Sequence, residues 1–225
     1  MSLARDASPD DSGAGVDPPD GLVCRSLELR RGDRAVLRGI DLTAAPGELV
    51  AIMGSSGGGK TTLLRLVAGL ERPSAGDVHR PSGRVGYAFQ EHRLLPWRTA
   101  VENVLLVRGR RPNADVRRAA LALLGALGVD DAADRRPDHL SGGMRQRVSL
   151  ARALFAEPAQ LLVDEPLSAV DRIARRRIGL EVRQRLGTAV ALWVTHDQEE
   201  AEAVADRIVT LTDGVLRPGA PEAGS

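Results

Sequence analysis

A glycine-rich stretch in the first third of the chain carries residue types that bind a phosphate chain. It reads Gly54-Ser55-Ser56-Gly57-Gly58-Gly59-Lys60-Thr61-Thr62. Glycines let backbone N–H groups converge on phosphate oxygens, because they tolerate a positive φ and place no Cβ in the way. The Lys60 ammonium suits the β- and γ-phosphates, and the Thr61 hydroxyl suits Mg²⁺. The spacing therefore predicts a site for a nucleoside triphosphate and its Mg²⁺.

Lys60 is the only lysine in the chain, among 31 Lys plus Arg residues. All other Lys or Arg positions of the chain are occupied by arginine. Position 60 therefore favours a compact ammonium group over the fork of a guanidinium group. The apolar run 49–53 before the stretch indicates a strand, and residues 62–68 after it indicate a helix. The N-terminal N–H groups and dipole of such a helix also favour an anion.

An acidic pair, Asp164 and Glu165, follows a second apolar run. We expect Asp164 to bind Mg²⁺, directly or through water, together with Thr61. Glu165 is then the candidate base that polarises the attacking water, a role that typically contributes about 10²–10⁴ in rate. The alternative is a strand-end turn, which the phosphate-binding stretch disfavours. Gln90 and His196, which also end apolar runs, are weaker candidates when taken alone.

These residues need a scaffold that brings distant parts of the chain together. Strands are predicted at 22–29, 36–42, 49–53, 85–89, 161–163, 190–194 and 208–211. Helices are predicted at 62–68, 144–156, 174–186 and 197–205, with a helical insert at 99–131 and a loop around Pro73 and Gly76. The alternation implies a mostly parallel sheet with its ligand at the carboxyl ends of the strands. The candidate residues all fall at such ends.

The composition narrows the class of protein. A net charge of +1 gives no electrostatic case for binding nucleic acid. The single cysteine, Cys24, excludes an internal disulfide and fits a reducing compartment. The sequence has no window of about 18 apolar residues and no N-terminal hydrophobic signal core. We therefore expect a soluble, cytoplasmic protein that reaches a membrane only through a partner.

Three parts are expected along the chain. Residues 1–20 are rich in Asp, Ser, Gly and Pro and are predicted to be a disordered tail. Residues 21–217 are predicted to form one nucleotide-binding domain, with its helical insert at about 91–156, and residues 218–225 a flexible C-terminal tail.

The candidate residues occur in the order of a known motif series. After Gln90 the chain has Leu140-Ser141-Gly142-Gly143-Met144-Arg145-Gln146-Arg147, Leu161-Leu162-Val163-Asp164-Glu165-Pro166, Ser168-Ala169-Val170-Asp171 and His196. Over about residues 21–217 the chain resembles the ATP-binding-cassette (ABC) ATPases, and the string at 140–147 is the most specific element. The resemblance implies an α/β fold, a P-loop NTPase of ABC type. Such a fold has a mostly parallel sheet core, an N-terminal antiparallel β subdomain and a helical insert.

The resemblance also implies roles for individual residues. Two copies of the domain would pair head-to-tail, with ATP held between the phosphate loop of one copy and Ser141-Gly142-Gly143 of the other. Asp171 would communicate across the dimer, His196 would contact the γ-phosphate, and Gln90 would bind Mg²⁺ and sense the attacking water. ATP binding would close the dimer, and hydrolysis by Glu165 would reopen it.

Arg31 is a departure from the family pattern. Family members often carry an aromatic residue just before the turn at Gly32, where it stacks on adenine. A guanidinium plane can also stack on a base, so Arg31 is a candidate adenine contact. The equal alternative is a solvated turn residue.

The string Leu94-Leu95-Pro96-Trp97 resembles the ATPases of nitrate, sulfonate and taurine importers. It implies an ATPase subunit that energises uptake of a small anion, together with transmembrane permease subunits and, indirectly, a solute-binding protein. Such a subunit lies on the inner face of the cell membrane through the permease. Trp97 would anchor the permease contact, and the alternative is a core aromatic residue of the helical insert.

Other functions compete with this hypothesis. An exporter ATPase would share the same motifs. A non-transport cassette protein acting on nucleic acid or ribosomes predicts tandem cassettes, a coiled-coil insertion or a basic face, and the sequence shows none of these. A nucleotide-binding regulator without hydrolysis is disfavoured by Glu165, Gln90 and His196.

Overall fold

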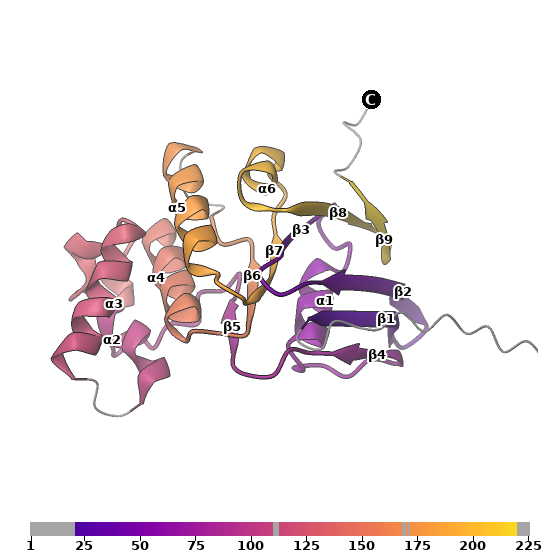
Figure 1. The fold of residues 1–225 in the computed structure, drawn as a ribbon, viewed down its shortest axis with the longest axis horizontal. Coiled ribbons are helices and arrows are strands. Elements are labelled where there is room, and N and C mark those ends of the chain that lie inside the picture. Colours follow the sequence, from indigo (N-terminus) through magenta and orange to yellow (C-terminus); the bar gives the residue numbers. More distant parts are fainter. Residues whose placement is uncertain (1–20, 110–112, 168–169, 171, 220–225) are drawn as a thin grey trace, which may run out of the picture.

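The computed structural model describes residues 21–109, 113–167, 170 and 172–219. The tail expected at 1–20 and most of the tail expected at 218–225 lie outside these ranges, as does Asp171. Within them, strands occupy one side of the molecule and most of the helices the other (Figure 1).

Two sheets form the β part of the molecule. The strands are β1 (Leu22–Arg31), β2 (Arg34–Ala44), β3 (Leu49–Met53), β4 (Ala75–His79), β5 (Val85–Ala88), β6 (Gln160–Asp164), β7 (Val190–Val194), β8 (Arg207–Thr212) and β9 (Val215–Pro218). The smaller sheet is antiparallel, with the order β2-β1-β4. The larger sheet has the order β5-β6-β7-β3-β8-β9 and is parallel except for β9.

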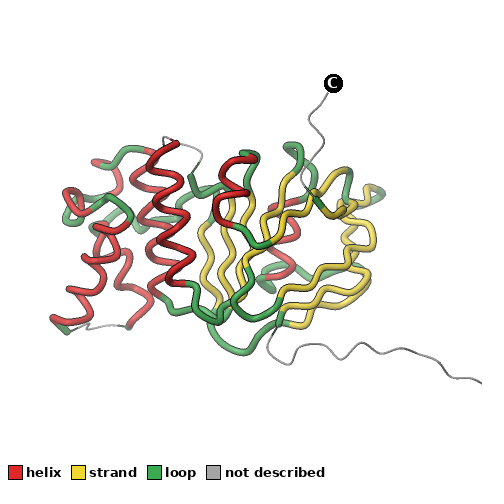
Figure 2. The backbone as a smooth tube through the Cα atoms, turned by 45° about the horizontal axis from the view of Figure 1, so that its top comes forward, coloured by secondary structure: helices red, strands yellow, loops and turns green. Residues whose placement is uncertain are grey.

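The helices gather beside the larger sheet (Figures 1 and 2). They are α1 (Lys60–Val67), α2 (Ala100–Leu105), α3 (Ala114–Ala126), α4 (Gly142–Phe155), α5 (Arg172–Arg185) and α6 (Gln198–Val204), with short 3₁₀ turns at Leu106–Arg108, Asp130–Ala132 and Pro137–His139. The segment predicted to be the helical insert, about residues 91–156, contains α2, α3 and α4. Within this segment, α2 and α3 pack against α4.

The larger sheet is covered on both faces, which explains why its strands read as continuous apolar runs. Along β6, Leu161 and Val163 pack in the core formed with the helical insert, α4 and α5. Leu162 between them packs on the opposite face, with α1 and the smaller sheet. In β7 the fully buried Trp193 belongs to the helical side. The central strands therefore serve two cores at once.

Helix α1 lies between the two sheets. Its Leu63 and Leu64 are fully buried among residues of both sheets. At its C-terminal end the Arg80 guanidinium donates hydrogen bonds to the carbonyl oxygens of Leu66 (2.6 Å) and Val67 (2.7 Å). A cation at this end satisfies carbonyl groups that have no partner within the helix. The position of α1, and of the glycine-rich loop before it, is thereby fixed.

The helical insert is held by caps and by one long side chain. Helix α2 begins with a capping box, in which Thr99 and Glu102 each bond the other's backbone N–H. Arg147 of α4 donates to the carbonyl oxygens of Leu127 (3.2 Å) and Gly128 (2.8 Å), which follow α3. Helices α3 and α4 are thus tied together at one end.

The prediction of a loop around Pro73 and Gly76 is wrong for the residues of β4, because they form a strand. The side chains of β4 are mostly exposed, so the sequence shows no apolar alternation there. Gly76 has a φ of +77°, and a Cβ on it would lie 2.4 Å from the carbonyl oxygens of Arg25 and Ser26. Gly76 therefore marks a close approach of two strands, a role that glycine has in strands as well as in loops.

The strand β9 was also not expected from the sequence pattern, which ended the core at 208–211. Asp213 and Gly214 connect β8 to β9 with φ values of 50° and 77°. Two consecutive positive φ values are typical of a type I′ hairpin, for which Asp-Gly is a favoured pair. The signal for this hairpin is thus present in the sequence.

The two tryptophans lie in opposite environments. Trp193 is fully buried, whereas Trp97 is 64% exposed. The interpretation of Trp97 as a core aromatic residue of the helical insert is therefore wrong.

Candidate nucleotide-binding site

The glycine-rich loop connects the end of β3 to the start of α1. Gly54 has a φ of +135°, and a Cβ on it would lie 2.1 Å from the carbonyl oxygen of Leu211 in β8. Gly59 has a φ of 102° and is the N-cap of α1. These two positions require glycine. Because the first N–H groups of a helix have no partner within it, this end of α1 can bind an anion.

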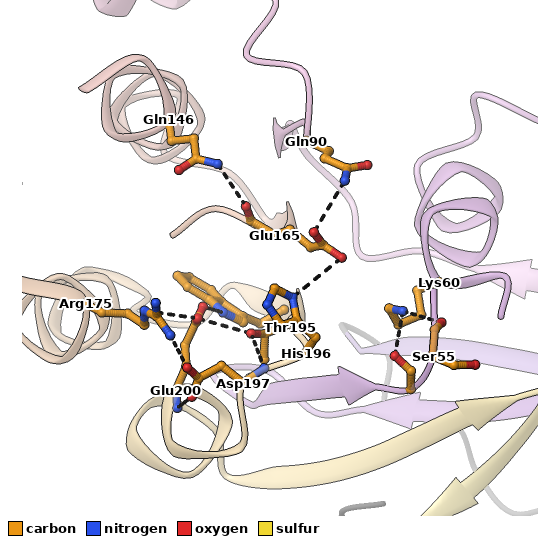
Figure 3. Close-up of polar contacts among 12 residues, drawn as sticks. Ser55, Lys60, Gln90, Gln146, Glu165, Arg175, Thr195, His196, Asp197 and Glu200 are labelled. Carbon is orange, nitrogen blue, oxygen red and sulfur yellow. Dashed lines mark hydrogen bonds and ion pairs between the residues drawn. The ribbon is translucent and has the colours of Figure 1, made fainter. Parts of the chain in front are cut away.

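Lys60 is held by the loop that precedes it. Its ammonium donates hydrogen bonds of 2.8 Å to the carbonyl oxygens of Gly54 and of Ser55 (Figure 3). Burial lowers the pKa of Lys60, and the nearby carboxylates of Glu165 and Asp164 oppose this shift. The ammonium is therefore already placed at the centre of the loop, between the loop carbonyls and two acidic side chains.

Asp164 ends β6 and is 2% exposed. The Thr61 hydroxyl donates a hydrogen bond to it. Burial raises the pKa of Asp164, and the bond from Thr61 and the charges of Lys60 and Arg65 lower it. The two residues predicted to bind Mg²⁺ thus lie in contact, with a hydroxyl and a carboxylate that are ligands Mg²⁺ prefers.

Glu165 connects three segments that are distant in sequence (Figure 3). Its carboxylate accepts a hydrogen bond of 3.4 Å from the Gln90 side-chain amide and lies 4.0 Å from His196 Nδ1. Its backbone N–H donates to the carbonyl oxygen of Val194 at 3.0 Å. Glu165 has a φ of 49°, which is uncommon for a residue other than glycine. Such backbone strain is concentrated at functional sites.

Gln146 is a site residue that the sequence reasoning did not assign. It lies in α4 and is 8% exposed. Its side-chain amide donates to the carbonyl oxygen of Glu165 at 3.5 Å (Figure 3). The signal available in the sequence was its place in the string at 140–147, which was read only as a partner surface.

A cavity of about 480 Å³ lies over the glycine-rich loop. It is lined by Arg31, Arg34, Val36, Ser56, Gly57, Gly59, Lys60, Thr61, Thr62, Gln90 and Glu165. The structure thus brings together most of the predicted phosphate-binding residues and two of the three predicted catalytic ones. Arg34 and Val36, from the start of β2, were not predicted.

Arg31 lies at the rim of this cavity with its side chain 56% exposed. Its guanidinium donates to both carboxylate oxygens of Glu71 at 3.1 Å. Both bonds come from one nitrogen, Nη2, so they hold that end of the Arg31 side chain against Glu71. Arg31 is therefore both a solvent-exposed residue and a wall of the cavity.

The segment Ser141-Gly142-Gly143 is not part of the cavity wall described above. Ser141 is the N-cap of α4, and its hydroxyl accepts a hydrogen bond from the Met144 N–H at 3.2 Å. Gly142 and Gly143 form the first turn of that helix. A second helix N-terminus able to bind an anion thus lies outside the lining of this cavity. Asp171 lies outside the described residues.

The fold and the loop define the class of protein. The glycine-rich loop follows a central parallel strand, β3, and the acidic pair follows β6, two strands away in the same sheet. This arrangement is that of a P-loop nucleoside triphosphatase. Within this class, the family model described as ABC transporter matches residues 37–168. The chain therefore belongs to the ABC transporter family.

Curated relatives cover most of the chain. The aliphatic sulfonates import ATP-binding protein SsuB 1 of Mesorhizobium japonicum is 44% identical over 84% of this chain and 75% of its own length. The SsuB proteins of Rhodopseudomonas palustris and Ralstonia nicotianae are 46% and 47% identical over 89% and 87% of this chain, and over 74% and 72% of their own lengths.

Solved structures agree with the fold. The dimeric structure of MJ0796, a bacterial ABC transporter cassette, matches with a TM-score of 0.79 and 30% identity, over 91% of this chain and 100% of that chain. A post-hydrolysis state of the same cassette, bound to ADP and phosphate, matches with a TM-score of 0.79 and 29% identity, over the same shares of the two chains. The predicted fold class is confirmed, and the chain is an ATPase coupled to transport. No helix in the described ranges is both long and apolar enough to cross a membrane.

Proposed function

We propose that the chain is the ATP-hydrolysing subunit of an importer for a small anion, with an aliphatic sulfonate as the first candidate solute. The support for import is the 44% to 47% identity to relatives named for aliphatic sulfonate import, over 84% to 89% of the chain. Nitrate and taurine belong to the same group of small anionic or sulfonate solutes and are the alternatives for the cargo. Export is the alternative for the direction, and the names of these relatives disfavour it.

The observation that carries hydrolysis is the position of Glu165 in the cavity wall, bonded to Gln90 and 4.0 Å from His196. Lys60 and the loop N–H groups would bind the phosphates. Glu165 would accept the proton of the attacking water, while Gln90 orients that water. His196 would donate to the γ-phosphate, where negative charge develops.

The residues at the end of β6 fit Mg²⁺. Thr61 and Asp164 already contact each other through a hydroxyl and a carboxylate oxygen. Gln90, bonded to Glu165 next to Asp164, is the third candidate ligand. A bound Mg²⁺ would neutralise charge on the β- and γ-phosphates. Thr61 and Asp164 would hold it with hard oxygen ligands, together with the phosphates themselves.

We infer that the complete site needs a second copy of the chain. The α4 N-terminus at Ser141-Gly142-Gly143 is exposed at its first residue and does not line the cavity of its own chain. In a head-to-tail pair it would supply a hydroxyl and N–H groups to the γ-phosphate of the partner's ATP. ATP would then close the dimer, and hydrolysis would reopen it. Asp171 would communicate across this interface.

The exposed Trp97 supports a permease contact. The loop that carries Trp97 is held in place by Asn103, which is fully buried. The Asn103 amide donates to the carbonyl oxygens of Leu95 (3.2 Å), Arg98 (3.2 Å) and Thr99 (3.0 Å), and its oxygen accepts from the Leu95 N–H (2.8 Å). A rigid loop with an exposed tryptophan is a suitable anchor for a partner protein. The permease would place the subunit on the cytoplasmic face of the membrane, and a solute-binding protein would act through the permease.

The test is ATP-driven transport in proteoliposomes. The chain is reconstituted with candidate permease subunits and a candidate solute-binding protein from its own genome, and labelled ethanesulfonate, nitrate and taurine are offered separately. We expect ATP-dependent accumulation of the sulfonate, and no accumulation with Glu165→Gln. Uptake of nitrate or taurine alone would reassign the cargo. ATP-driven efflux of the solute would overturn the assignment as an importer.

A further inference from the structure

Arg175 of α5 faces two acidic residues at the start of α6 (Figure 3). Its guanidinium forms an ion pair with Asp197, and its Nε lies 3.8 Å from a carboxylate oxygen of Glu200. A further guanidinium nitrogen donates to the carbonyl oxygen of Val170 at 3.0 Å. The Arg175 side chain is 18% exposed and that of Glu200 only 3%. This is a largely buried charge cluster outside the nucleotide cavity.

The same cluster holds both neighbours of His196. Glu200 accepts hydrogen bonds from the Trp193 indole (2.7 Å) and the Thr195 hydroxyl (3.1 Å). The Thr195 hydroxyl accepts from the Asp197 N–H at 3.1 Å, and Asp197 caps α6 by accepting from the Glu200 N–H at 2.9 Å. The residues directly before and after His196 are therefore fixed by side-chain bonds.

His196 itself has little support of its own. Its side chain is 64% exposed, and its ring reaches Glu165 at 4.0 Å. Its position must therefore follow from the backbone at Thr195 and Asp197. Because the carboxyl groups of Glu200 and Asp197 lie in a largely buried place, Arg175 is the cation that faces both of them. Removal of one partner of a buried charge cluster leaves uncompensated charge and shifts its neighbours.

We propose that Arg175 is a positioning residue for ATP hydrolysis. Arg175 would hold His196 in place beside Glu165, and its own bond to the carbonyl oxygen of Val170 would link His196 to that segment. The proposal rests on the role proposed for His196. Since Val170 directly precedes Asp171, which is proposed to communicate across the dimer, Arg175 joins the segment at that interface to the residue at the γ-phosphate. A change in the dimer would thus be transmitted to His196 through the side chain of Arg175.

The test is a double-mutant cycle on purified protein with radiolabelled ATP, so that slow variants stay measurable. We expect Arg175→Met to lower kcat by about 10- to 100-fold, as misplacement of a reacting group does, and to leave nucleotide affinity unchanged to within about twofold. In a His196→Ala background, Arg175→Met should lower kcat no further. Arg175→Lys keeps the charge but not the planar fork, and we expect it to recover part of kcat.

The control is Arg176→Met, which removes an exposed arginine one position along the same helix and should leave kcat unchanged. Thermal unfolding shows which variants are folded, and if Arg175→Met does not fold, the same cycle is run with Arg175→Lys. An equal loss of kcat in the wild-type and His196→Ala backgrounds would overturn the proposal, as would an unchanged kcat in Arg175→Met. An unchanged kcat in His196→Ala alone would instead refute the role of His196 itself.

Discussion

The side-chain amide of Gln90 donates a hydrogen bond of 3.4 Å to the carboxylate of Glu165, although 75 residues separate them in the chain. Gln90 follows β5 and Glu165 follows β6, and these two strands are parallel neighbours. The bond therefore joins the segments that follow two adjacent strands. It also connects the carboxylate proposed as the base to the segment that leads into the exposed Trp97.

Glu165→Gln should separate ATP binding from hydrolysis. The amide cannot accept a proton, so we expect kcat to fall by about 10²- to 10⁴-fold, while ATP affinity is retained. With ATP bound, this variant should accumulate as a stable protein dimer, which size-exclusion chromatography with light scattering measures. Hydrolysis at the wild-type rate, or a monomer at saturating ATP, would contradict the mechanism.

Lys60→Ala should abolish ATP binding. The variant loses a charge interaction of about 4 kcal/mol at 4 Å and an effective dielectric constant of 20, which corresponds to about three orders of magnitude in affinity. Isothermal titration calorimetry with ATP and Mg²⁺ measures the loss. Arg72→Ala, which removes an exposed positive charge outside the cavity, is the matched control and should bind normally. Equal affinities in the two variants would refute the role of Lys60.

Gly142→Ala should leave the folding stability of the chain intact and weaken its ATP-dependent pairing with a second copy. A Cβ on Gly142 meets no atom within 4 Å, so the monomer accommodates it. Alanine in a helix is more favourable than glycine by up to about 1 kcal/mol, so unfolding in urea should show an equal or higher stability. The ATP-dependent dimer should nevertheless weaken, because the Cβ obstructs approach of the phosphate.

Gly125→Ala is the control for this variant, because a Cβ in α3 makes only ordinary contacts of 3.7 Å or more. We expect Gly125→Ala to dimerise with ATP as the unmodified chain does. Normal ATP-dependent dimerisation of Gly142→Ala would show that the α4 N-terminus does not bind the partner's nucleotide.

Glu200 should give the folding stability a specific pH dependence. Burial raises its pKa above the ordinary 4.5, against the bonds from Trp193 and Thr195 and the charge of Arg175. Between pH 4.5 and the raised pKa of the folded chain, the folded chain thus holds a proton that the unfolded chain has released. The unfolding free energy contributed by this group is complete below pH 4.5 and is lost as the pH rises through the folded pKa.

The comparison of the unmodified chain with Glu200→Gln isolates this contribution. Urea unfolding from pH 4 upwards should show that the stability difference moves in favour of Glu200→Gln as the pH rises. A difference that is independent of pH, or that moves towards the unmodified chain, would show that the pKa of Glu200 is not raised.

Trp97→Ala should weaken binding to a partner protein without changing the folding stability of the chain. Because the side chain is 64% exposed, we expect a change in unfolding free energy within about 0.5 kcal/mol and an unchanged ATPase rate of the isolated chain. Binding to detergent-solubilised permease should be lost in a pull-down assay. Trp193→Ala is the contrast, since removal of this buried ring should cost about 3–5 kcal/mol. Retained permease binding by Trp97→Ala would move the contact elsewhere.

The strands of the larger sheet could be predicted because both of its faces are buried. The runs 49–53 and 190–194 coincide with β3 and β7, and the acidic pair lies at the end of β6 as expected. β4 could not be predicted, because its stability comes from backbone pairing with β1 and its side chains are mostly exposed. An exposed edge strand leaves no apolar periodicity to recognise.

The loop proposed to bind the phosphates could be located from the sequence because consecutive residues form it. The ion pair of Arg31 with Glu71 and the bond from Gln146 to Glu165 could not be predicted, because each joins distant segments. The cluster around Arg175 has the same origin, since it depends on the packing of α5 against α6. Short-range motifs identify ligands of the phosphate, whereas the contacts that orient them are set by tertiary structure.

The two hydrogen bonds from Lys60 to the loop carbonyls have a practical consequence for spectroscopy. Since Lys60 is the only lysine of the chain and is 6% exposed, lysine labelled with ¹⁵N at Nζ would give one side-chain signal, from the phosphate-binding centre alone. Its bonds to Gly54 and Ser55 slow exchange of the ammonium protons with water, which favours detection. A shift of that signal on addition of ATP would report occupancy of the site without any substitution in the protein.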